Sequence, residues 1–269
     1  NDNFRICYTY DKNDNVVSKK HILNGEAHTI ANTFNKDDLL TKSVIDGDEI
    51  NYEYDELGRL INSSINNHNN CNYKYLSMGK RTLAIVDSVE NNEHVYSYKY
   101  DNLYNITEIY VDNKIVKKYY YDNFNELIKE ENYATNQKIE YNYDNLGNLL
   151  TKITTDMSIN AIIKTDTYQY TNSNWKDQLT DYNGNNISYD EIGNPIAIGS
   201  DISLSWINGK NLYTYKSISK NLEVGYKYNI NNIRTSKIVN GIETKYYLEN
   251  NNIIYEEKNN DLIYYIYDG

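Results

Sequence analysis

Short segments in which polar and apolar positions alternate, each ending in a cluster of turn residues, run along the whole chain. In YEYDELGRLI, which begins at Tyr52, two tyrosines are two residues apart, and Asp55 and Gly58 separate them from Leu60. Strand side chains alternate between the two faces of a sheet, so Tyr52 and Tyr54 share one face. Because tyrosine favours strands and Asp, Asn and Gly favour turns, the segment predicts a β-hairpin.

The same segment recurs at intervals of about 21 residues, which is typical of a repeat protein. Further copies are YTYDKNDNVV from Tyr8, YKYLSMGKRT from Tyr73, YKYDNLYNIT from Tyr98, YYYDNFNELI from Tyr119, YNYDNLGNLL from Tyr141, YQYTNSNWKD from Tyr168, ISYDEIGNPI from Ile187, YKYNINNIRT from Tyr226 and KYYLENNNII from Lys245. Weaker copies are expected near Phe34 and in LSWINGKNLY, where Trp206 stands in the place of a tyrosine. No linker interrupts the series, so residues 1–269 are expected to form a single array of about twelve hairpins, a fragment of a larger protein.

The turn of each copy predicts a common geometry. Its first residue can accept hydrogen bonds from backbone N–H groups ahead of it. This role is assigned to Asp11, Asp55, Asp101, Asp122, Asp144, Asp190 and Asp268. The third residue further on should tolerate a positive φ. It is Asp14, Gly58, Gly79, Asn125, Gly147, Gly193, Asn232 or Asn251. Tyr104 does not fit that position, and a changed loop is expected there.

One hairpin cannot fold alone, because ordering some 20 residues costs on the order of 20 kcal/mol and two tyrosines return only about 5 kcal/mol. Stacked hairpins share ladder hydrogen bonds and bury each other's tyrosines. The sequence therefore predicts an all-β fold: tandem hairpins forming one long curved or spiralling antiparallel sheet. Helices are excluded because no stretch sustains an apolar i, i+3, i+4 pattern.

The recurring residues are predicted to be structural and not catalytic. A catalytic acid is needed once in a protein, whereas a residue that recurs at the same position of each repeat has a role that all repeats share. The predicted structural positions are the tyrosines Tyr52, Tyr54, Tyr98, Tyr100, Tyr119, Tyr121, Tyr141 and Tyr143, the turn residues Asp55, Gly58, Asp101, Asp122, Asp144, Gly147, Asp190 and Gly193, and the apolar residues Leu60 and Leu149.

The composition of the chain excludes several classes of partner and of protein. The formal net charge is −11 and no cluster of Lys and Arg occurs, which argues against nucleic acid and anionic membranes as partners. The sequence contains no run of 18 apolar residues, so no membrane-spanning segment is predicted. The 31 tyrosines argue against disorder. Cys7 and Cys71 show no metal-ligand spacing, and whether they pair stays open.

Motifs for other chemistry are lacking, and no cofactor, metal or catalytic residue is predicted. The four histidines have no ligand spacing, and there is no nucleophile elbow, phosphate loop or dinucleotide fingerprint. The Asp-rich turns offer oxygen ligands for Ca²⁺, but they lack the loop length and bidentate Glu of an EF-hand. An enzyme is therefore not expected.

YEYDELGRL, YNYDNLGNLL and ISYDEIGNP resemble the YD repeats of bacterial Rhs proteins, wall-associated proteins, Tc-toxin C components and animal teneurins. The resemblance covers the whole chain and implies the last part of a repeat shell, a β-strip that spirals around a C-terminal toxin or effector tail. It implies a secreted or cell-surface protein whose partners are the rest of its own shell and the enclosed tail. The autoprotease segment of that family does not occur in this sequence.

An alternative function remains open from the residues alone. Exposed rows of tyrosine could stack on sugar rings, as in extracellular arrays that bind glycans or cell surfaces. Such arrays are generally richer in Gly and Trp, whereas this chain has 12 Gly and 2 Trp. The identity of the enclosed toxin, the glycan and the oligomeric state are not predicted.

Overall fold

The computed structural model describes residues 4–78 and 81–267, and every regular element in these ranges is a β-strand. The chain divides into two compact units, Asn1–Lys138 (unit 1) and Ile139–Gly269 (unit 2). Gly79 and Asp268, which the sequence assigns to turns, lie outside the described residues.

Unit 1 is a meander of antiparallel strands, each paired with the next along the chain. Its strands are β1 (Arg5–Tyr10), β2 (Val16–Leu23), β3 (Glu26–Phe34), β4 (Leu40–Ile45), β5 (Asp48–Tyr54), β6 (Leu60–Ile65), β7 (His68–Met78), β8 (Arg81–Glu90), β9 (Val95–Tyr100), β10 (Ile106–Val111), β11 (Lys114–Tyr121) and β12 (Leu127–Asn132).

Unit 2 repeats this arrangement, with consecutive antiparallel pairs from β14 to β25. Between the two sets lies β13 (Gln137–Tyr143). The strands that follow are β14 (Leu149–Asp156), β15 (Ala161–Gln169), β16 (Asp181–Tyr182), β17 (Asn185–Tyr189), β18 (Pro195–Ile198), β19 (Ile202–Ile207), β20 (Asn211–Ser217), β21 (Leu222–Tyr228), β22 (Arg234–Val239), β23 (Ile242–Glu249), β24 (Asn252–Lys258) and β25 (Asp261–Tyr264).

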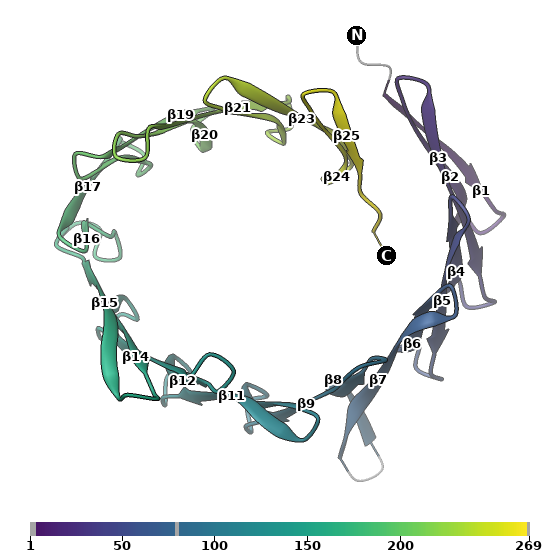
Figure 1. Ribbon diagram of the computed structural model, residues 1–269, viewed down its shortest axis with the longest axis horizontal. Helices are drawn as coiled ribbons and strands as arrows, with labels where there is room; N and C mark the ends of the chain where they lie inside the picture. Colours follow the sequence, from purple (N-terminus) through teal and green to yellow (C-terminus); the bar gives the residue numbers. More distant parts are fainter. Residues whose placement is uncertain (1–3, 79–80, 268–269) are drawn as a thin grey trace. The chain divides into compact units, whose positions relative to one another are not determined.

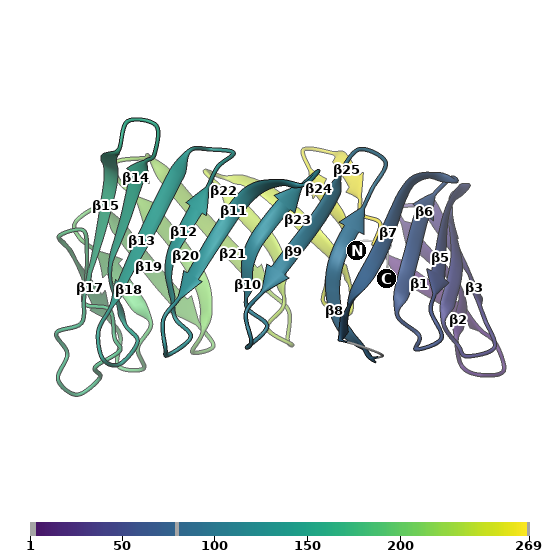
Figure 2. The ribbon, with the colours of Figure 1, turned by 90° about the horizontal axis from the view of Figure 1, so that it is seen from below.

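Within each unit the turns alternate between the two edges of the strip (Figures 1 and 2). One edge carries the turns that follow the tyrosine pairs, and we call it the Asp-turn rim. In Figure 2 the turns between β9 and β10 and between β11 and β12 lie at this rim of unit 1, at the lower edge of the view. The other edge carries mostly short turns, such as Asn24–Gly25 between β2 and β3, and we call it the opposite rim.

A β-bulge accompanies the turn in several hairpins of the Asp-turn rim. Across the β5–β6 hairpin Tyr54 pairs with Leu60, but Glu53 pairs with Asn62, so β6 holds one extra residue. The same register shift occurs at Tyr10, Phe34, Tyr121, Tyr189 and Tyr228. A type I turn followed by a residue at positive φ and a bulge is a common hairpin connection, and the bulge increases the local twist.

Turns at the opposite rim were not predicted from the sequence. Asn24 and Gly25 have φ of 52° and 95°, and Asn240 and Gly241 have 46° and 85°. Two consecutive residues at positive φ make a type I′ turn, whose twist matches that of the flanking strands and which favours Asn-Gly. The Asn-Gly pairs in the sequence were the signal for these turns.

Few side chains are fully buried, because no second layer covers the sheet in the described part of either unit. The buried apolar side chains are Leu23, Ile45, Ile50, Tyr52, Val224, Tyr247, Ile254 and Tyr255. Most other strand residues are half-buried against neighbours in the same sheet. Tyrosine suits this setting, since its ring packs while its hydroxyl reaches a polar partner.

The all-β hairpin architecture predicted from the sequence is confirmed. The weaker copies fold as the others do: Phe34 precedes the turn Asn35–Leu39, and Trp206 lies near the end of β19. The copy at Tyr168 departs from the pattern. An irregular segment over residues 170–180 follows β15, and β16 contains only two residues.

Candidate functional site

The turn at Asp55 shows what the repeated Asp does. Its Oδ1 accepts the backbone N–H groups of Leu57 at 2.9 Å and Arg59 at 3.0 Å. The backbone closes the turn as well, since Gly58 N–H donates to Asp55 O and Asp55 N–H donates to Arg59 O, both at 3.0 Å. Gly58 has a φ of 75°. Oδ2 accepts the Nε–H of Arg59 at 2.7 Å, so both carboxylate oxygens and both backbone groups of Asp55 are engaged within its own turn.

Other copies show the same hydrogen bonds. An Asp carboxylate accepts the N–H groups two and four residues ahead at Asp11, Asp101, Asp122, Asp144 and Asp190. At the copies beginning with Asn35 and Asn229 an amide oxygen accepts in place of the carboxylate. The residue three positions on has a positive φ at Asp14, Gly58, Asn125, Gly147, Gly193 and Asn232.

Two details of this turn prediction are wrong. Tyr104 was expected to change its loop, but it takes a φ of 64° and its N–H donates to Asp101 O as Gly58 does to Asp55. The carboxylate bonds of the turn offset the cost of about 1–2 kcal/mol for a left-handed residue. In the turn after β23, Glu249 pairs with Asn252, and the positive φ falls on Asn250 and not on Asn251.

The electrostatics of these turns do not suit a general acid. The Asn148 side chain, which donates to Oδ2, and then the backbone N–H of Asn148 lower the pKa of Asp144. The Arg59 side chain does the same for the pKa of Asp55. A general acid at neutral pH needs a raised pKa. These carboxylates stay ionised and hold the turn.

We expect Asp144→Asn to change the stability of the protein by less than about 1 kcal/mol, because an amide oxygen makes the same turn bonds at Asn35 and Asn229. Asp144→Ala should cost about 1–2 kcal/mol, since two backbone N–H groups lose their acceptor. Urea denaturation of both variants measures the difference. Equal losses in the two variants would contradict the turn-forming role of this side chain.

The second tyrosine of many pairs bonds to the preceding hairpin. The hydroxyl of Tyr54 donates to the backbone oxygen of Leu40 at 2.8 Å, and that of Tyr121 donates to Ile106 O at 3.0 Å. In these two copies the acceptor is the first strand residue after the previous turn of the Asp-turn rim. Equivalent bonds join Tyr75 to Leu60, Tyr228 to Leu212 and Tyr267 to Ile253, and similar ones join Tyr100 to Val86 and Tyr189 to Leu179.

Two copies without the tyrosine keep the bond by other means. Trp206 donates its indole Nε1–H to Pro195 O at 2.7 Å. Where Phe34 has no donor, the amide of Asn32 donates to Val16 O at 2.9 Å. A buried carbonyl without a partner is costly, so each repeat supplies some donor at this position. Together with the burial that raises the pKa of Tyr54, Tyr100 and Tyr121, this marks the second tyrosine as a structural hydroxyl donor.

A second recurring contact joins hairpins at the opposite rim. The side-chain oxygen of Asp46 accepts the N–H of Thr29 at 2.9 Å, while Asp46 N–H donates to Thr29 O at 3.2 Å. The same exchange occurs between Asn66 and Glu49, Asp112 and Val95, Asn183 and Thr167, and Asn240 and Glu223. In each case the Asp or Asn side chain of the turn accepts a backbone N–H of the preceding hairpin, as a carbonyl oxygen of a neighbouring strand would. Hydrogen bonds therefore join neighbouring hairpins at the opposite rim as well as near the Asp-turn rim.

The tyrosine pairs occupy the predicted strand positions. Tyr52 is buried, and Tyr54, Tyr98, Tyr100, Tyr119, Tyr121, Tyr141 and Tyr143 are half-buried. Leu60 and Leu149 follow their turns as the first residues of β6 and β14, also half-buried. Cations cover some of the rings, as Arg59 does for Tyr75 at 4.3 Å and Arg234 for Tyr226 at 4.1 Å. These faces are used inside the sheet, which does not favour sugar stacking.

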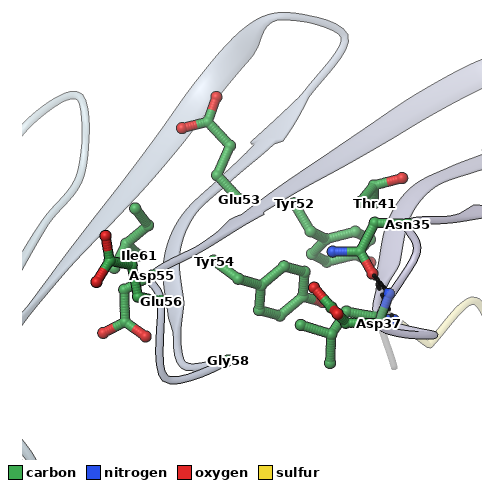
Figure 3. Close-up of a pocket in the computed structure, with 11 residues that line it drawn as sticks. Asn35, Asp37, Thr41, Tyr52, Glu53, Tyr54, Asp55, Glu56, Gly58 and Ile61 are labelled. Atoms are coloured by element: carbon green, nitrogen blue, oxygen red, sulfur yellow. Dashed lines mark hydrogen bonds between the residues drawn. The ribbon is translucent and has the colours of Figure 1, made fainter.

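A recess of about 670 Å³ lies between the turns 35–39 and 55–59 of neighbouring hairpins (Figure 3). Asp37, Tyr52, Tyr54 and Glu56 are among its lining residues. A comparable recess of about 430 Å³ lies beside the turn of Asp101. Because the space returns with the repeat, it is the gap left between adjacent twisted turns and not a unique catalytic pocket.

Asp166 in β15 is the most strongly perturbed carboxylate. It is buried and accepts from Lys164 Nζ at 2.9 Å, Tyr182 Oη at 2.9 Å and Asn183 Nδ2 at 2.8 Å. The Lys164 ammonium first and the Asn183 amide next lower the pKa of Asp166 to about 2. Lys164 is in the same strand, Tyr182 is in the adjacent strand β16, and Asn183 is in the turn that follows β16. The group therefore fixes the β15–β16 junction.

This environment predicts a pH effect. The folded pKa of Asp166 is about 2, below an unfolded value of about 3.9, so its contribution is complete above pH ~4 and is lost as the pH falls towards 2. Asp166→Asn should lose stability at pH 7 and show a flatter profile between pH 4 and 2. Thermal melts across this range measure both, with Asp177→Asn in the irregular segment as the control. A slope unchanged in Asp166→Asn would contradict the assignment.

Groups of three or more His, Cys, Asp or Glu placed to hold a metal ion do not occur in residues 4–78 and 81–267. Over the same ranges, no helix has the length and apolar character to cross a membrane. Cys7 and Cys71 are free thiols in the structure.

The same hydrogen bonds join each hairpin to its neighbour in repeat after repeat. This arrangement defines the class of the protein, a repeat protein built of tandem β-hairpins. The structure resembles that of chains in Tc toxins. It matches a Tc holotoxin pore from Photorhabdus luminescens with a TM-score of 0.71 and 15% identity over 94% of this chain and 15% of that one. It matches TcdB2-TccC3-Cdc42 with a TM-score of 0.62 and 15% identity over 93% of this chain and 16% of that one.

TcdB2-TccC3 without its hypervariable C-terminal region gives a TM-score of 0.62 and 14% identity over 95% of this chain and 16% of that one. No family model and no curated protein matches the sequence. The chain thus spans about 15% of the length of the Tc chain it matches with the highest of these scores. At this identity the likeness concerns the fold, and the resemblance to YD-repeat shells is confirmed at that level.

Proposed function

We propose that this chain is a stretch of an encapsulating shell of the Rhs type, with no catalysis of its own, that encloses or presents a toxin or effector tail. The observation that carries the proposal is the repeated pair of inter-hairpin bonds, the hydroxyl bond exemplified by Tyr121 and Ile106 and the side-chain bond exemplified by Asp46 and Thr29. Because these bonds join successive hairpins, a sheet only one layer thick can form a continuous barrier. The fold shared with the Tc toxin chains supports the same conclusion.

The proposed partners are the rest of the same shell and the enclosed tail, and the proposed location is outside the producing cell or on its surface. One of the similar structures is TcdB2-TccC3 without its hypervariable C-terminal region. In this chain the turn carboxylates and the paired tyrosines are engaged in the sheet, which supports a structural role for them.

Protease protection in the complete gene product tests the proposal. If the chain is shell wall, the segment that follows the repeats should resist a protease under native conditions and become sensitive when Tyr54→Ala and Tyr121→Ala weaken the wall. Cleavage of that segment in the unmodified protein as fast as in the variant would contradict encapsulation. The complete coding sequence identifies the segment to follow in this experiment.

The same material tests the glycan alternative. Tyr213 is about half exposed in β20 and is the best-placed ring of this strand for sugar stacking. Glycan binding that Tyr213→Ala abolishes without a change in melting temperature would support a binding module instead.

A further inference from the structure

The Asp-turn rim exposes apolar side chains at a recurring position. They are Leu57, Leu103 and Phe124 in unit 1 and Leu146, Ile192 and Ile230 in unit 2, and we call them the rim row. Each is between 64% and 98% exposed. All but Ile230 are the second residue after the Asp that opens the turn.

The turn itself does not require this apolar residue. Asn13 and Asp37 fill the same place in the first two turns, where Asp11 and Asn35 make the same hydrogen bonds to the backbone. The residue just before it in the rim-row turns is polar, as at Glu56, Asn102 and Asn123. Exposed apolar side chains that recur along one edge mark an interaction surface more often than single ones do.

The charge of this rim indicates the chemistry of its partner. In unit 1 the turns 11–15, 35–39, 55–59, 101–105 and 122–126 hold nine Asp or Glu and three Lys or Arg, a net −6. In unit 2 the turns 144–148, 190–194, 208–210 and 229–233 hold three Asp or Glu and one Lys, a net −2. Hydrogen bonds from Asn105 and Asn148 hold the pKa of Asp101 and Asp144 below its ordinary value, so these charges persist in mild acid. Two such rims would repel each other.

We propose that the rim row docks a cationic protein segment that also carries apolar side chains. The rim supplies both halves of the match, an apolar contact at the turn tips and negative charge beside it. Each tip offers on the order of 100 Å² of apolar surface, so the three members of each unit offer roughly 300 Å², which fits a short peptide segment and is smaller than the 800 Å² per partner of a standard interface. Leu103 and Phe124 lie on neighbouring turns of the rim, two strands or roughly 10 Å apart, which sets the spacing of two apolar contacts of the partner. This inference does not depend on what the shell encloses.

Labelled peptides test the proposal by fluorescence anisotropy at physiological salt. The probes are a peptide of Lys and Leu, a Lys/Ser peptide of equal length and charge, and a Glu/Leu peptide. We expect the Lys/Leu peptide to bind at least tenfold more tightly than the other two. Leu103→Asn combined with Phe124→Asn should weaken it at least tenfold, and Asn suits the turn because Asn13 occupies the same position.

Ile218→Asn is the matched control, because Ile218 is 78% exposed in a turn of the opposite rim. It should change the affinity less than twofold, and the melting temperatures of all variants should show that they fold. Equal binding of the Lys/Ser peptide, or undiminished binding by the double variant, would overturn the proposal. Self-association in sedimentation experiments that the double variant abolishes would assign the rim row to a second copy and overturn it as well.

Discussion

Gly193→Ala is expected to destabilise the protein by about 2–3 kcal/mol. Gly193 has a φ of 90°, and a left-handed conformation costs an alanine about 1–2 kcal/mol. A Cβ there would also lie 2.5 Å from Cη2 of the Trp175 ring, too close for the ring to keep its place. Trp175 is 46% exposed, so its ring can move towards solvent, and the loss of its packing against the turn costs about a further 1 kcal/mol. Urea denaturation measures the loss, and the fluorescence of Trp175 in a Trp206→Phe background reports the movement of the ring.

Gly58→Ala is the matched control for this prediction. Gly58 holds the same position in its turn, with a φ of 75°, but a Cβ there would meet only Leu39 Cδ1, at an ordinary 3.7 Å. Its cost should be the backbone cost alone, about 1–2 kcal/mol. In a Trp175→Ala background the cost of Gly193→Ala should fall to the same value. Equal costs for the two glycines in the native background would rule out the ring contact as the cause.

The sequence predicted this turn but not its covering ring. Tyr-x-Tyr followed by Asp and, three residues on, Gly or Asn is a local signal, because the Asp bonds to N–H groups two and four residues ahead. Trp175 reaches Gly193 from the irregular segment 170–180, which departs from the repeat and therefore has no counterpart elsewhere to compare it with. Contacts made once in an array cannot be found from the periodicity of that array.

The opposite rim was within reach of the sequence. Asn24–Gly25, Asn183–Gly184 and Asn240–Gly241 are typical of type I′ turns, and the structure places each between two paired strands. What the sequence could not provide is the partner of each turn. Asn183 bonds to Thr167 and Asn240 bonds to Glu223. The number of residues between the two partners depends on the register in which whole hairpins pair, which the turn sequence alone does not specify.

Tyr104 and Asn32 show how the repeat tolerates substitutions. A tyrosine adopts a left-handed φ of 64° because the bonds of Asp101 hold the turn around it. Asn32 takes over the donor role that Phe34 cannot perform. In both copies the hydrogen bonds are kept while the residue changes. The repeat therefore depends on satisfying particular backbone groups more than on any one residue type.

That argument leads to the second large effect, which is expected at Tyr121. Tyr121→Ala should destabilise the protein by about 3 kcal/mol, because a half-buried ring is lost and Ile106 O loses its donor. Tyr121→Phe keeps the ring and should cost about 1 kcal/mol. Urea denaturation separates the two contributions. Tyr213→Phe is the control, since its ring is about half exposed in β20, and it should be neutral.

The same bond predicts a response to alkali. Burial first, and then the nearby Tyr119 and Asp101, raise the pKa of Tyr121 above its ordinary value of 10.0. The neutral hydroxyl therefore stabilises the fold fully below pH ~10, and this contribution is lost as the pH rises through the folded pKa. Tyr121→Phe should flatten the decline in stability above pH 10, whereas Tyr213→Phe should leave it unchanged. A decline as steep in Tyr121→Phe as in the native protein would mean that the hydroxyl does not join these hairpins.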